Sequence, residues 1–387
     1  MQSRPRRLFL IFHGRFPSEK AASLFVAKNA EAFADKNIKV ILIVPRRIGR
    51  KKESPYSYYH VKNNFRVVYL PVIDFYFIPF WRVLSFWFSF ASFSVGCFFY
   101  LLLKASRPDI IYSNESLPLF LASFIFPNTF YEMHDFPESK LAPFSFFIRR
   151  MKWVLAHNMW KAERVKNIFK VAEEKILCEQ NAEDIEEFDT PVSKEEAREE
   201  LGLPKDKKIA VYTGHLYGWK GTDTLAEATG NLGNDYLTIF VGGTKEDIAK
   251  FKNDYGANKN ILIAGFRPHS EISLWQKAAD VLVLPNTAKE DISKYYTSPM
   301  KIFGYAASRR PIVASRIPSI MELVGEKSAF LVNPDDPEAL ARGIEFAALN
   351  KEESISRSDV AYEWVKDHTW EKRAGRVADY MNFQEGE

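Results

Sequence analysis

Short apolar runs alternate along this chain with longer stretches in which apolar residues recur every three or four positions. In the first half, the runs that predict strands are residues 8–12, 40–44, 67–70, 110–113, 129–132 and 176–178. In the second half they are residues 209–213, 237–241, 261–264, 281–284, 311–314 and 329–332. Strands that alternate with helices are typical of parallel α/β sheets, so the pattern predicts two doubly wound domains.

A charged stretch at 189–208, DTPVSKEEAREELGLPKDKK, separates the two halves. It predicts a short helix that Ser193 caps and that ends near Gly202. We therefore expect a first domain of residues 1–188 and a second of 189–359, with a last helix in 360–387 that crosses back onto the first. Ligands bind at the carboxyl ends of parallel strands, so the two domains are expected to face a central cleft.

Two segments raise the question of a membrane. Residues 83–103 carry no charge and are long enough to span a bilayer, but their serines and scattered aromatic rings favour a buried or interface-lying helix. Residues 144–169 mix aromatic and basic side chains, as in a helix that lies on anionic lipid or in an ordinary amphipathic helix. Aromatic residues just before the first segment suit lipid headgroups: Phe75, Tyr76, Phe77, Phe80 and Trp81.

Composition supports a globular protein of 387 residues, with 47% hydrophobic, 26% charged and an unusually high 15% aromatic residues. Residues 1–55 contain thirteen Lys or Arg against four acids, and residues 46–52 are the densest part of this basic region. Such charge suits anionic lipid or acidic substrates, and no nucleic-acid motif accompanies it. Cys97 and Cys178 provide neither a disulfide framework nor a metal cluster.

The N-terminal sequence MQSRPRRLFLIF has too short an apolar run for an export signal and predicts a first strand instead. A cytoplasmic protein, peripheral on the inner face of the cell membrane, is therefore expected. Whether residues 83–103 span or only contact the membrane stays open at this point.

Candidate chemistry lies where the predicted strands of the second half end. In TSPMKIFGYAASRRPIVAS, Ser298 and Pro299 predict a helix start whose first amides would bind an anion. In VYTGHLYGWKG, Lys220 would bring a positive charge to the same anion from a second side. Gly243 and the stretch Gly265-Phe266-Arg267 follow two further strands, where the backbone can approach a planar base.

These segments together resemble the retaining glycosyltransferases of family 4, which have the GT-B fold. TGHLYGWKGTDTL is similar to the family's Gly-Arg-Leu-…-Lys-Gly segment, and SPMKIFGYAASRRPIVAS to its Ser-Pro-Leu-Lys-Leu-Phe-Glu-Tyr stretch. NILIAGFRPHSEISLWQKAADVLVLPN resembles the family's base-binding turn, ILCEQNAEDIEEF its entry to the linker, and FYEMHDFP the strand before its mid-domain histidine. The resemblance covers nearly the whole chain.

The resemblance implies transfer of a hexose from a UDP- or GDP-sugar, with retention of configuration, to a lipid-linked or saccharide acceptor. By the same resemblance, His134 and Lys220 are catalytic, and Asp135 is a candidate base. The donor-binding residues that it implies are Gly14, His215, Lys220, Gly221, Gly243, Phe266, Arg267, Ser298, Pro299, Met300 and Gly304. It calls for no cofactor and no metal, although a weakly held Mg²⁺ on the diphosphate stays open.

The sequence departs from the family at several site positions. Two glutamates eight positions apart are replaced by Tyr296 and Gly304, the basic pair is His215 and Lys220, and the glycine pair of the first loop is absent. Two alternatives therefore stay open: a catalytically degenerate subunit that binds sugar nucleotides, and a nucleotide-sugar epimerase. The expected partners are a nucleotide sugar, the acceptor and an anionic membrane surface, with no nucleic acid.

Overall fold

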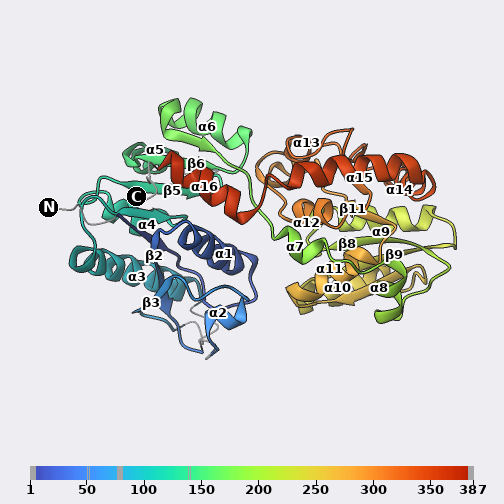
Figure 1. Ribbon diagram of the computed structural model, residues 1–387, viewed down its shortest axis with the longest axis horizontal. Helices are drawn as coiled ribbons and strands as arrows, with labels where there is room; N and C mark the ends of the chain where they lie inside the picture. Colours follow the sequence, from blue (N-terminus) through green and yellow to red (C-terminus); the bar gives the residue numbers. More distant parts are fainter. Residues whose placement is uncertain are drawn as a thin grey trace. The chain divides into compact units, whose positions relative to one another are not determined.

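The computed structural model describes residues 6–49, 51, 53–75, 82–137, 139 and 141–381, so the predicted aromatic contacts at 76–81 lie outside the described residues. The chain forms two compact units, coloured by sequence in Figure 1. The first contains the residues up to Gln180 and those from Trp370 onward, and the second contains Asn181–Thr369. The boundary precedes the predicted one because Phe188 packs into the core of the second unit.

Seven parallel strands form the sheet of the first unit, in the order β3-β2-β1-β4-β5-β6-β7. The strands are β1 (Arg7–Ile11), β2 (Lys39–Arg46), β3 (Arg66–Pro71), β4 (Ile110–Ser113), β5 (Thr129–Met133), β6 (Trp153–Ala156) and β7 (Ile176–Cys178). The helices are α1 (Ala21–Asp35), α2 (Pro55–Tyr58), α3 (Arg82–Lys104), α4 (Ser116–Ala122), α5 (Leu141–Arg150), α6 (Met159–Phe169), η2 (Glu173–Lys175) and α16 (Trp370–Tyr380). The strand order reverses between β1 and β4, which is where open α/β sheets bind ligands.

Six parallel strands form the sheet of the second unit, in the order β10-β9-β8-β11-β12-β13. The strands are β8 (Lys208–Thr213), β9 (Tyr236–Val241), β10 (Ile261–Gly265), β11 (Val281–Leu284), β12 (Ile312–Ser315) and β13 (Phe330–Val332). The other elements are α7 (Ile185–Phe188), α8 (Lys194–Glu200), η3 (Gly218–Lys220), α9 (Thr222–Asn231), α10 (Lys245–Tyr255), α11 (His269–Lys277), η4 (Ile292–Tyr296), α12 (Lys301–Ala307), α13 (Pro318–Met321), α14 (Pro337–Leu349) and α15 (Lys351–Val365). Here the strand order reverses between β8 and β11.

The predicted strands form because their apolar runs are covered on both faces, as parallel sheets require. All five residues of β1 and all four of β11 are buried, for example. The predicted helix after the domain boundary is confirmed as α8, since Ser193 and Glu196 form a reciprocal capping box at its start.

The prediction of one amphipathic helix at 144–169 is wrong. The segment contains the end of α5, strand β6 and α6. The four residues of β6, WVLA, are fully buried and pair with both β5 and β7, so the sheet overrides the basic and aromatic pattern around them. Lys161, predicted to face lipid, is buried in α6.

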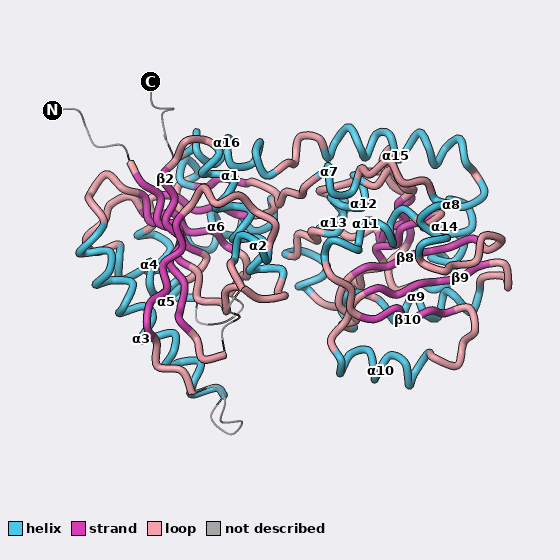
Figure 2. The backbone as a smooth tube through the Cα atoms, turned by 60° about the horizontal axis from the view of Figure 1, so that its bottom comes forward, coloured by secondary structure: helices cyan, strands magenta, loops and turns pink. Residues whose placement is uncertain are grey.

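The predicted last helix is also divided in the structure. Helix α15 ends at Val365 and belongs to the second unit, whereas α16 begins at Trp370 and belongs to the first. Figure 2 shows α16 beside α1, the helix with which it shares its contacts in the first unit. Only residues from Trp370 onward therefore return to the first unit, rather than the whole of 360–387.

Helix α3 has an inverted distribution of polar and apolar residues. Its buried residues are Ser85, Ser89, Phe93, Ser94, Cys97 and Leu101, and all of them except Ser94 recur every four residues. Its exposed residues are large and apolar: Val83, Leu84, Phe86, Trp87, Phe88, Val95, Phe99, Leu102 and Leu103. Among the described residues, Val83–Lys104 is a helix long and apolar enough to cross a membrane. Only 33% of its most apolar 18-residue stretch is buried inside the protein. The predicted buried helix is therefore confirmed for one face only.

Candidate functional site

In the second unit, glycines bring the ends of three strands close together. Gly221, after β8, has a φ of +70°, and a Cβ atom there would lie 1.8 Å from the carbonyl oxygen of Pro285, just after β11. Gly242, after β9, has a φ of +119°, and its Cβ would lie 2.5 Å from the carbonyl oxygen of Gly214. Glycine alone tolerates both this backbone conformation and this close approach.

Two lysines project into this region of strand ends. Lys301 Nζ lies 3.7 Å from the ring centroid of Tyr212, is buried and has no hydrogen-bond partner within the part of the chain that the structure describes. Lys220 Nζ lies 3.7 Å from the ring centroid of Trp219. Burial lowers the pKa of Lys220 to about 7, and burial together with the charge of Lys220 lowers the pKa of Lys301 well below its usual value. Both shifts have the same cause, because each amine is shielded from the water that would stabilise its charged form.

Other buried polar atoms of this region share one property with the ammonium group of Lys301: they have no hydrogen-bond partner among the described residues. They include Thr222 Oγ1, Asn286 Oδ1 and Ser298 Oγ. Each such group costs about 1–3 kcal/mol when it is left unpaired. Several of them beside two lysines indicate a surface suited to a ligand with anionic oxygens and hydroxyl groups.

In the first unit, His134 follows β5 and lies next to two other ionisable side chains. Its Nε2 atom is 3.7 Å from Glu132 Oε2, and His157 Nε2 is 3.3 Å from Glu132 Oε1. The two imidazole rings meet edge to face, with their centroids 4.9 Å apart. Since 3.7 Å exceeds a hydrogen bond, the attraction between His134 and Glu132 is electrostatic.

Glu132 itself is held from helix α16. Arg373 is fully buried and donates hydrogen bonds to Glu132 Oε1 at 2.5 Å, to Asn29 Oδ1 at 3.1 Å and to the Gln180 carbonyl at 3.0 Å. The hydroxyl of Tyr112 donates to Glu132 Oε2. Burial alone would raise the pKa of Glu132, but Arg373 and the two histidines bring it below its usual value, so the carboxylate stays charged.

Lys161 holds the loop that carries His134. Its Nζ atom is buried and donates to the carbonyl of His134 at 2.5 Å and, more weakly, to that of Met133 at 3.4 Å. Burial lowers the pKa of Lys161 to about 8. The backbone at the end of β5 is therefore fixed by a cation from α6.

Glu132, His134 and His157 could also be considered as a metal site, because one ligand atom from each lies within 4.8 Å of the others. Both carboxylate oxygens of Glu132, however, already accept hydrogen bonds, and the guanidinium group of Arg373 would repel a cation. The arrangement fits a network of ion pairs better than a metal centre. The expectation that no metal is required stays a prediction.

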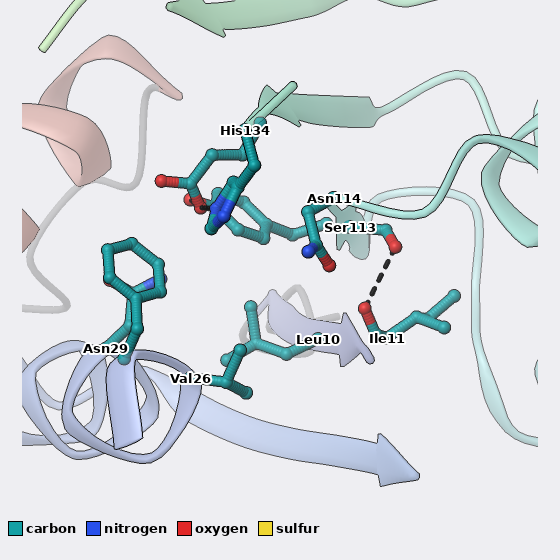
Figure 3. A pocket seen from close by; sticks show the side chains of 10 residues that line it. Leu10, Ile11, Val26, Asn29, Ser113, Asn114 and His134 are labelled. Atoms are coloured by element: carbon teal, nitrogen blue, oxygen red, sulfur yellow. Dashed lines mark hydrogen bonds and ion pairs between the residues drawn. The ribbon is translucent and has the colours of Figure 1, made fainter. Parts of the chain in front are cut away.

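A small pocket lies beside these groups at the carboxyl ends of β1, β4 and β5. Figure 3 shows Asn29, Asn114 and His134 around it, with the Ser113 hydroxyl donating to the Ile11 carbonyl at 2.9 Å. The lining is mixed: Leu10, Phe25 and Val26 are apolar, whereas Asn29, Asn114 and His134 offer groups that donate and accept hydrogen bonds.

Comparison with known proteins adds to this geometry. Residues 193–364 match the family described as glycosyl transferases group 1. The matched residues all lie within the second unit.

The chain is 27% identical over 194 residues to TuaC of Bacillus subtilis, provisionally named a teichuronic acid biosynthesis glycosyltransferase; the alignment covers 50% of this chain and 45% of TuaC. It is 25% identical over 223 residues to the D-inositol 3-phosphate glycosyltransferase 1 of Catenulispora acidiphila, covering 54% and 51%. The matched part thus spans about half the length of these curated relatives.

Among solved structures, Alr3699/HepE of Anabaena in complex with UDP superposes with a TM-score of 0.76 at 18% identity, covering 98% of this chain and 100% of that one. At this identity the likeness shows the fold. The chain therefore has the two Rossmann-like domains of the GT-B fold, as predicted.

The predicted helix start at Ser298 and Pro299 is wrong by about two residues. Helix α12 begins at Lys301, the amide of Ile302 donates to the Pro299 carbonyl, and Ser298 offers a buried hydroxyl instead of a cap. The chain before it forms a π-helix, η4, so residues 297–300 connect two helical turns rather than follow a loop. Met300 immediately precedes Lys301, and the Ser298 carbonyl accepts a hydrogen bond from Asn181 at 3.1 Å.

Gly304 lies in α12 against an aromatic ring. A Cβ atom at this position would lie 3.0 Å from the ring of Phe188 in α7, which is closer than ordinary van der Waals contact. A glutamate side chain would therefore have to displace Phe188. The structure thus explains why this position is small, whereas a role of Gly304 in donor binding stays a prediction.

The other predicted donor-binding residues surround the strand ends of the second unit. His215 is exposed and stacks on Tyr217, with centroids 4.9 Å apart and an interplanar angle of 8°. Gly243 has a φ of +96°, Phe266 is 58% exposed, and Arg267 lies over the ring of Trp275 at 5.6 Å.

Gly14 and Asp135 belong to the first unit. A Cβ atom on Gly14 would lie 2.1 Å from the ring of Phe12, so a glycine is needed for packing here. Asp135 is exposed next to His134, which leaves its predicted role as a base untested. The predicted site residues thus lie in both units. Gly14, His134 and Asp135 belong to the first, and the other predicted residues belong to the second.

The sequence analysis missed Lys301, Glu132, Lys161 and Arg373. Lys301 lies inside the quoted SPMKIFGY segment, so a search for a second cation near Ser298 could have found it. Glu132 lies two positions before His134 in a buried strand, where a lone carboxylate signals a buried partner. No local pattern identifies that partner as Arg373, because 241 residues separate the two.

Proposed function

We propose that the protein is a retaining glycosyltransferase that moves a hexose from a UDP- or GDP-sugar to a lipid-linked acceptor at a membrane. The match of residues 193–364 to the glycosyl transferases group 1 family and the similarity in fold to a protein solved with UDP support this proposal. The donor is assigned to the second unit and the acceptor to the first.

The observation that carries the proposal is a pair of neighbouring lysines: Lys220, which is half-buried, and Lys301, whose ammonium group is buried. A nucleoside diphosphate brings two phosphates, whose oxygens can accept hydrogen bonds from both ammonium groups and from Thr222 and Ser298. Binding would offset the cost of burying these cations. During transfer the same charges stabilise the departing diphosphate, the group on which negative charge develops.

The reaction breaks the bond between the sugar C1 and a phosphate oxygen and forms a bond between C1 and an acceptor hydroxyl oxygen on the same face. The proton of that hydroxyl passes to the departing phosphate oxygen, so no protein nucleophile is needed. His134 contacts the reacting sugar or orients the acceptor. Lys220 and Lys301 hold the leaving group throughout.

The exposed surface of helix α3 supports the proposal that the acceptor is bound to a membrane. Its serines are used inside the first unit: Ser89 Oγ is 3.2 Å from His13 Nε2, and Ser85 Oγ accepts from the Phe75 amide at 3.1 Å. Its outward faces, by contrast, present Phe and Trp side chains and Leu103, which is 81% exposed. Exposed apolar surface of this extent is typical of sites that contact a membrane or a protein.

The neighbouring helices add basic groups to this surface. Helix α4 packs on α3, and α5 packs on α4. Phe124 and Phe146 are exposed here, and the Arg150 guanidinium lies 4.2 Å from the centroid of Phe124. Aromatic side chains next to arginines suit the headgroup region of an anionic bilayer. We therefore propose that α3, α4 and α5 rest on the membrane.

The first experiment measures release of nucleoside diphosphate by the purified chain from a panel of UDP-, GDP- and ADP-sugars, with and without a bacterial lipid extract. Release from one donor class that increases with lipid is expected. Silence across the panel in a folded protein would overturn the proposed activity.

The roles of the lysines are tested by Lys220→Ala and Lys301→Met. Each is expected to lower kcat/KM by about a hundredfold or more, since loss of one charge-stabilising donor costs about 2.7–4 kcal/mol in such sites. Lys205→Met is the control, because Lys205 is exposed and pairs with Glu199 at the surface of the same unit. Unchanged kinetics of the two site variants would refute the diphosphate assignment.

Membrane binding is tested by flotation with vesicles that contain anionic lipid. Phe99→Glu and Leu103→Glu together are expected to abolish flotation, whereas Leu349→Glu, an exposed apolar residue of the second unit, should leave it unchanged. Extraction by alkaline carbonate distinguishes a peripheral helix, which is released, from a spanning one, which is retained.

One observation favours a second candidate function, a subunit that binds sugar nucleotides without transfer. Gly304 replaces the family's ribose-binding glutamate and lies against Phe188, so this carboxylate is missing from the donor region. Tight binding of UDP or GDP in calorimetry, with no release from any donor in the presence of lipid, would establish this alternative.

A further inference from the structure

Helix α16 contacts the end of β5 through Arg373. Arg373 is fully buried in the first unit and binds Glu132 at 2.5 Å. A buried ion pair is expensive to assemble, because both charges lose their hydration, and it adds little stability compared with apolar packing. Its presence next to His134 calls for a reason other than stability.

The carboxylate of Glu132 lies between two imidazoles. Its Oε1 atom is 3.3 Å from His157 Nε2 and its Oε2 atom is 3.7 Å from His134 Nε2. His134 Nε2 is buried and has no hydrogen-bond partner among the described residues, so Glu132 acts on it as a nearby negative charge. That charge favours, in each neutral imidazole, the form that carries its hydrogen on Nε2. Nδ1 of each ring is then an acceptor.

We infer that Glu132, held in place by Arg373, is a positioning residue that fixes the orientation and the tautomer of His134 and His157. The inference rests on the proposed function for its catalytic meaning, since His134 is the residue assigned to the sugar or the acceptor. In this tautomer, Nδ1 of His134 accepts a hydrogen bond from a sugar or acceptor hydroxyl.

The fixed ring is also held by apolar contacts. Phe25 of α1 meets the rings of His134 and His157 edge to face, with centroids 5.0 and 6.1 Å away, and meets Trp370 in the same way at 5.1 Å. Arg373 in turn lies 5.2 Å from the centroid of Phe25. The start of α16 thus supports the imidazole pair from two sides, by charge and by packing.

Other charged groups act on the same pair and have to be kept constant in a test. The ionisable and charged groups that face it are Glu115, Glu132, Asp135, Lys161 and Arg373. Of these, Glu132 is the group whose oxygens lie beside both Nε2 atoms.

Nitrogen-15 NMR of the imidazoles tests the inference directly, because the chemical shifts report which nitrogen carries the hydrogen. His134→Asn and His157→Asn assign the two signals. In the wild-type protein both neutral rings are expected to carry hydrogen on Nε2. In Glu132→Gln, which keeps the size of the side chain but removes its charge, a mixture of the two tautomers is expected.

A second variant covers the case in which Glu132→Gln does not fold. Glu132→Asp keeps the charge for Arg373 but withdraws the carboxylate from the imidazoles, so it is also expected to give mixed tautomers. Arg376→Met is the matched control, because Arg376 lies on the same helix and pairs with Glu179 at 2.7 Å instead of Glu132. Wild-type tautomers in a folded Glu132 variant would overturn the inference.

Kinetics provide a second readout. Glu132→Asp is expected to lower kcat by about tenfold to a hundredfold, as small misplacements of catalytic groups do, with KM for the nucleotide sugar nearly unchanged. A loss confined to KM would contradict a role in positioning His134. If the Glu132 variants show mixed tautomers but the wild-type protein has no transferase activity, the proposed function is refuted and the inference about the tautomers stands.

Discussion

The two units treat buried charge in opposite ways at the ends of their strands. In the first, each cation has a partner: Arg373 binds Glu132, and Lys161 binds the carbonyl of His134. In the second, Lys220 and Lys301 lie close together, and Lys301 Nζ, which lies over the ring of Tyr212, has no hydrogen-bond partner among the described residues. A paired buried charge fixes geometry, whereas an unpaired one is satisfied by a ligand.

Arg373→Met tests this contrast in the first unit and is expected to have the largest effect. It leaves Glu132 buried without its cation, which costs about 3–5 kcal/mol of the free energy of unfolding. Denaturation in urea measures the loss. Arg376→Met is the control and should cost about 0–1 kcal/mol, since the Arg376 side chain is 41% exposed. Similar losses for the two variants would show that burial of the first pair is not what matters.

Lys301→Met should have the opposite sign in the absence of ligand. Removal of an unpaired buried amine is expected to raise the free energy of unfolding by about 1–3 kcal/mol. UDP at about 100 times its Kd should stabilise the wild-type protein by about 2.7 kcal/mol and should leave the variant nearly unchanged. Thermal melts with and without UDP check both parts, and a variant that UDP still stabilises fully would contradict the contrast.

Gly304→Glu sharpens the comparison within the second unit. The new side chain has to displace Phe188, so we expect a loss of about 1–3 kcal/mol from overpacking and no gain in nucleotide affinity. Phe188→Ala combined with Gly304→Glu provides the matched variant, in which the space is available. Tighter UDP binding by the single variant in calorimetry would show that the position opens to the ligand.

The remaining effects concern pH; they have the same sign in both units but fall in different pH windows. The pKa of Lys220 is lowered from its usual value to about 7, so between about pH 7 and 10.5 the unfolded chain holds a proton that the folded one has lost, and stability rises with pH. The pKa of Glu132 is lowered, so its contribution is present above its usual value and is lost as pH falls. Urea denaturation from pH 3 to 10, with hydrogen exchange to assign each unit, measures both trends. UDP should remove the gain at alkaline pH, because a bound anion keeps Lys220 protonated.

Much of the fold could be predicted from the sequence, because buried parallel strands have continuous apolar runs that turns interrupt. Strand β6 was missed because WVLA is short and lies among basic and aromatic residues that suggest an amphipathic surface helix. The boundary at Gln180 was missed because the charged segment at 189–208 suggested a linker there. Phe188 lies just before that segment but packs in the core of the second unit, so the second unit begins earlier.

The site was predictable where a motif is local and not where it depends on packing. Lys220 and His134 follow strands and stand out in the sequence, whereas the significance of Lys301 depends on its burial beside Tyr212. Arg373 looks like any basic residue of an amphipathic helix until α16 is placed on α1. The interpretation of Gly304 as a departure from the family's pattern stays a prediction, and the neighbouring ring of Phe188 could not be inferred from its position in the chain.

The return of α16 to the first unit has a consequence for synthesis. Domains generally fold as units while the chain is being made. Here the sheet of the first unit emerges from the ribosome early, but Arg373 follows only after the whole of Asn181–Thr369 has been made. Until then Glu132 has no guanidinium partner, and the face of α1 that α16 covers is open. The first unit is thus completed last, so its histidine pair matures only when the second unit is already present.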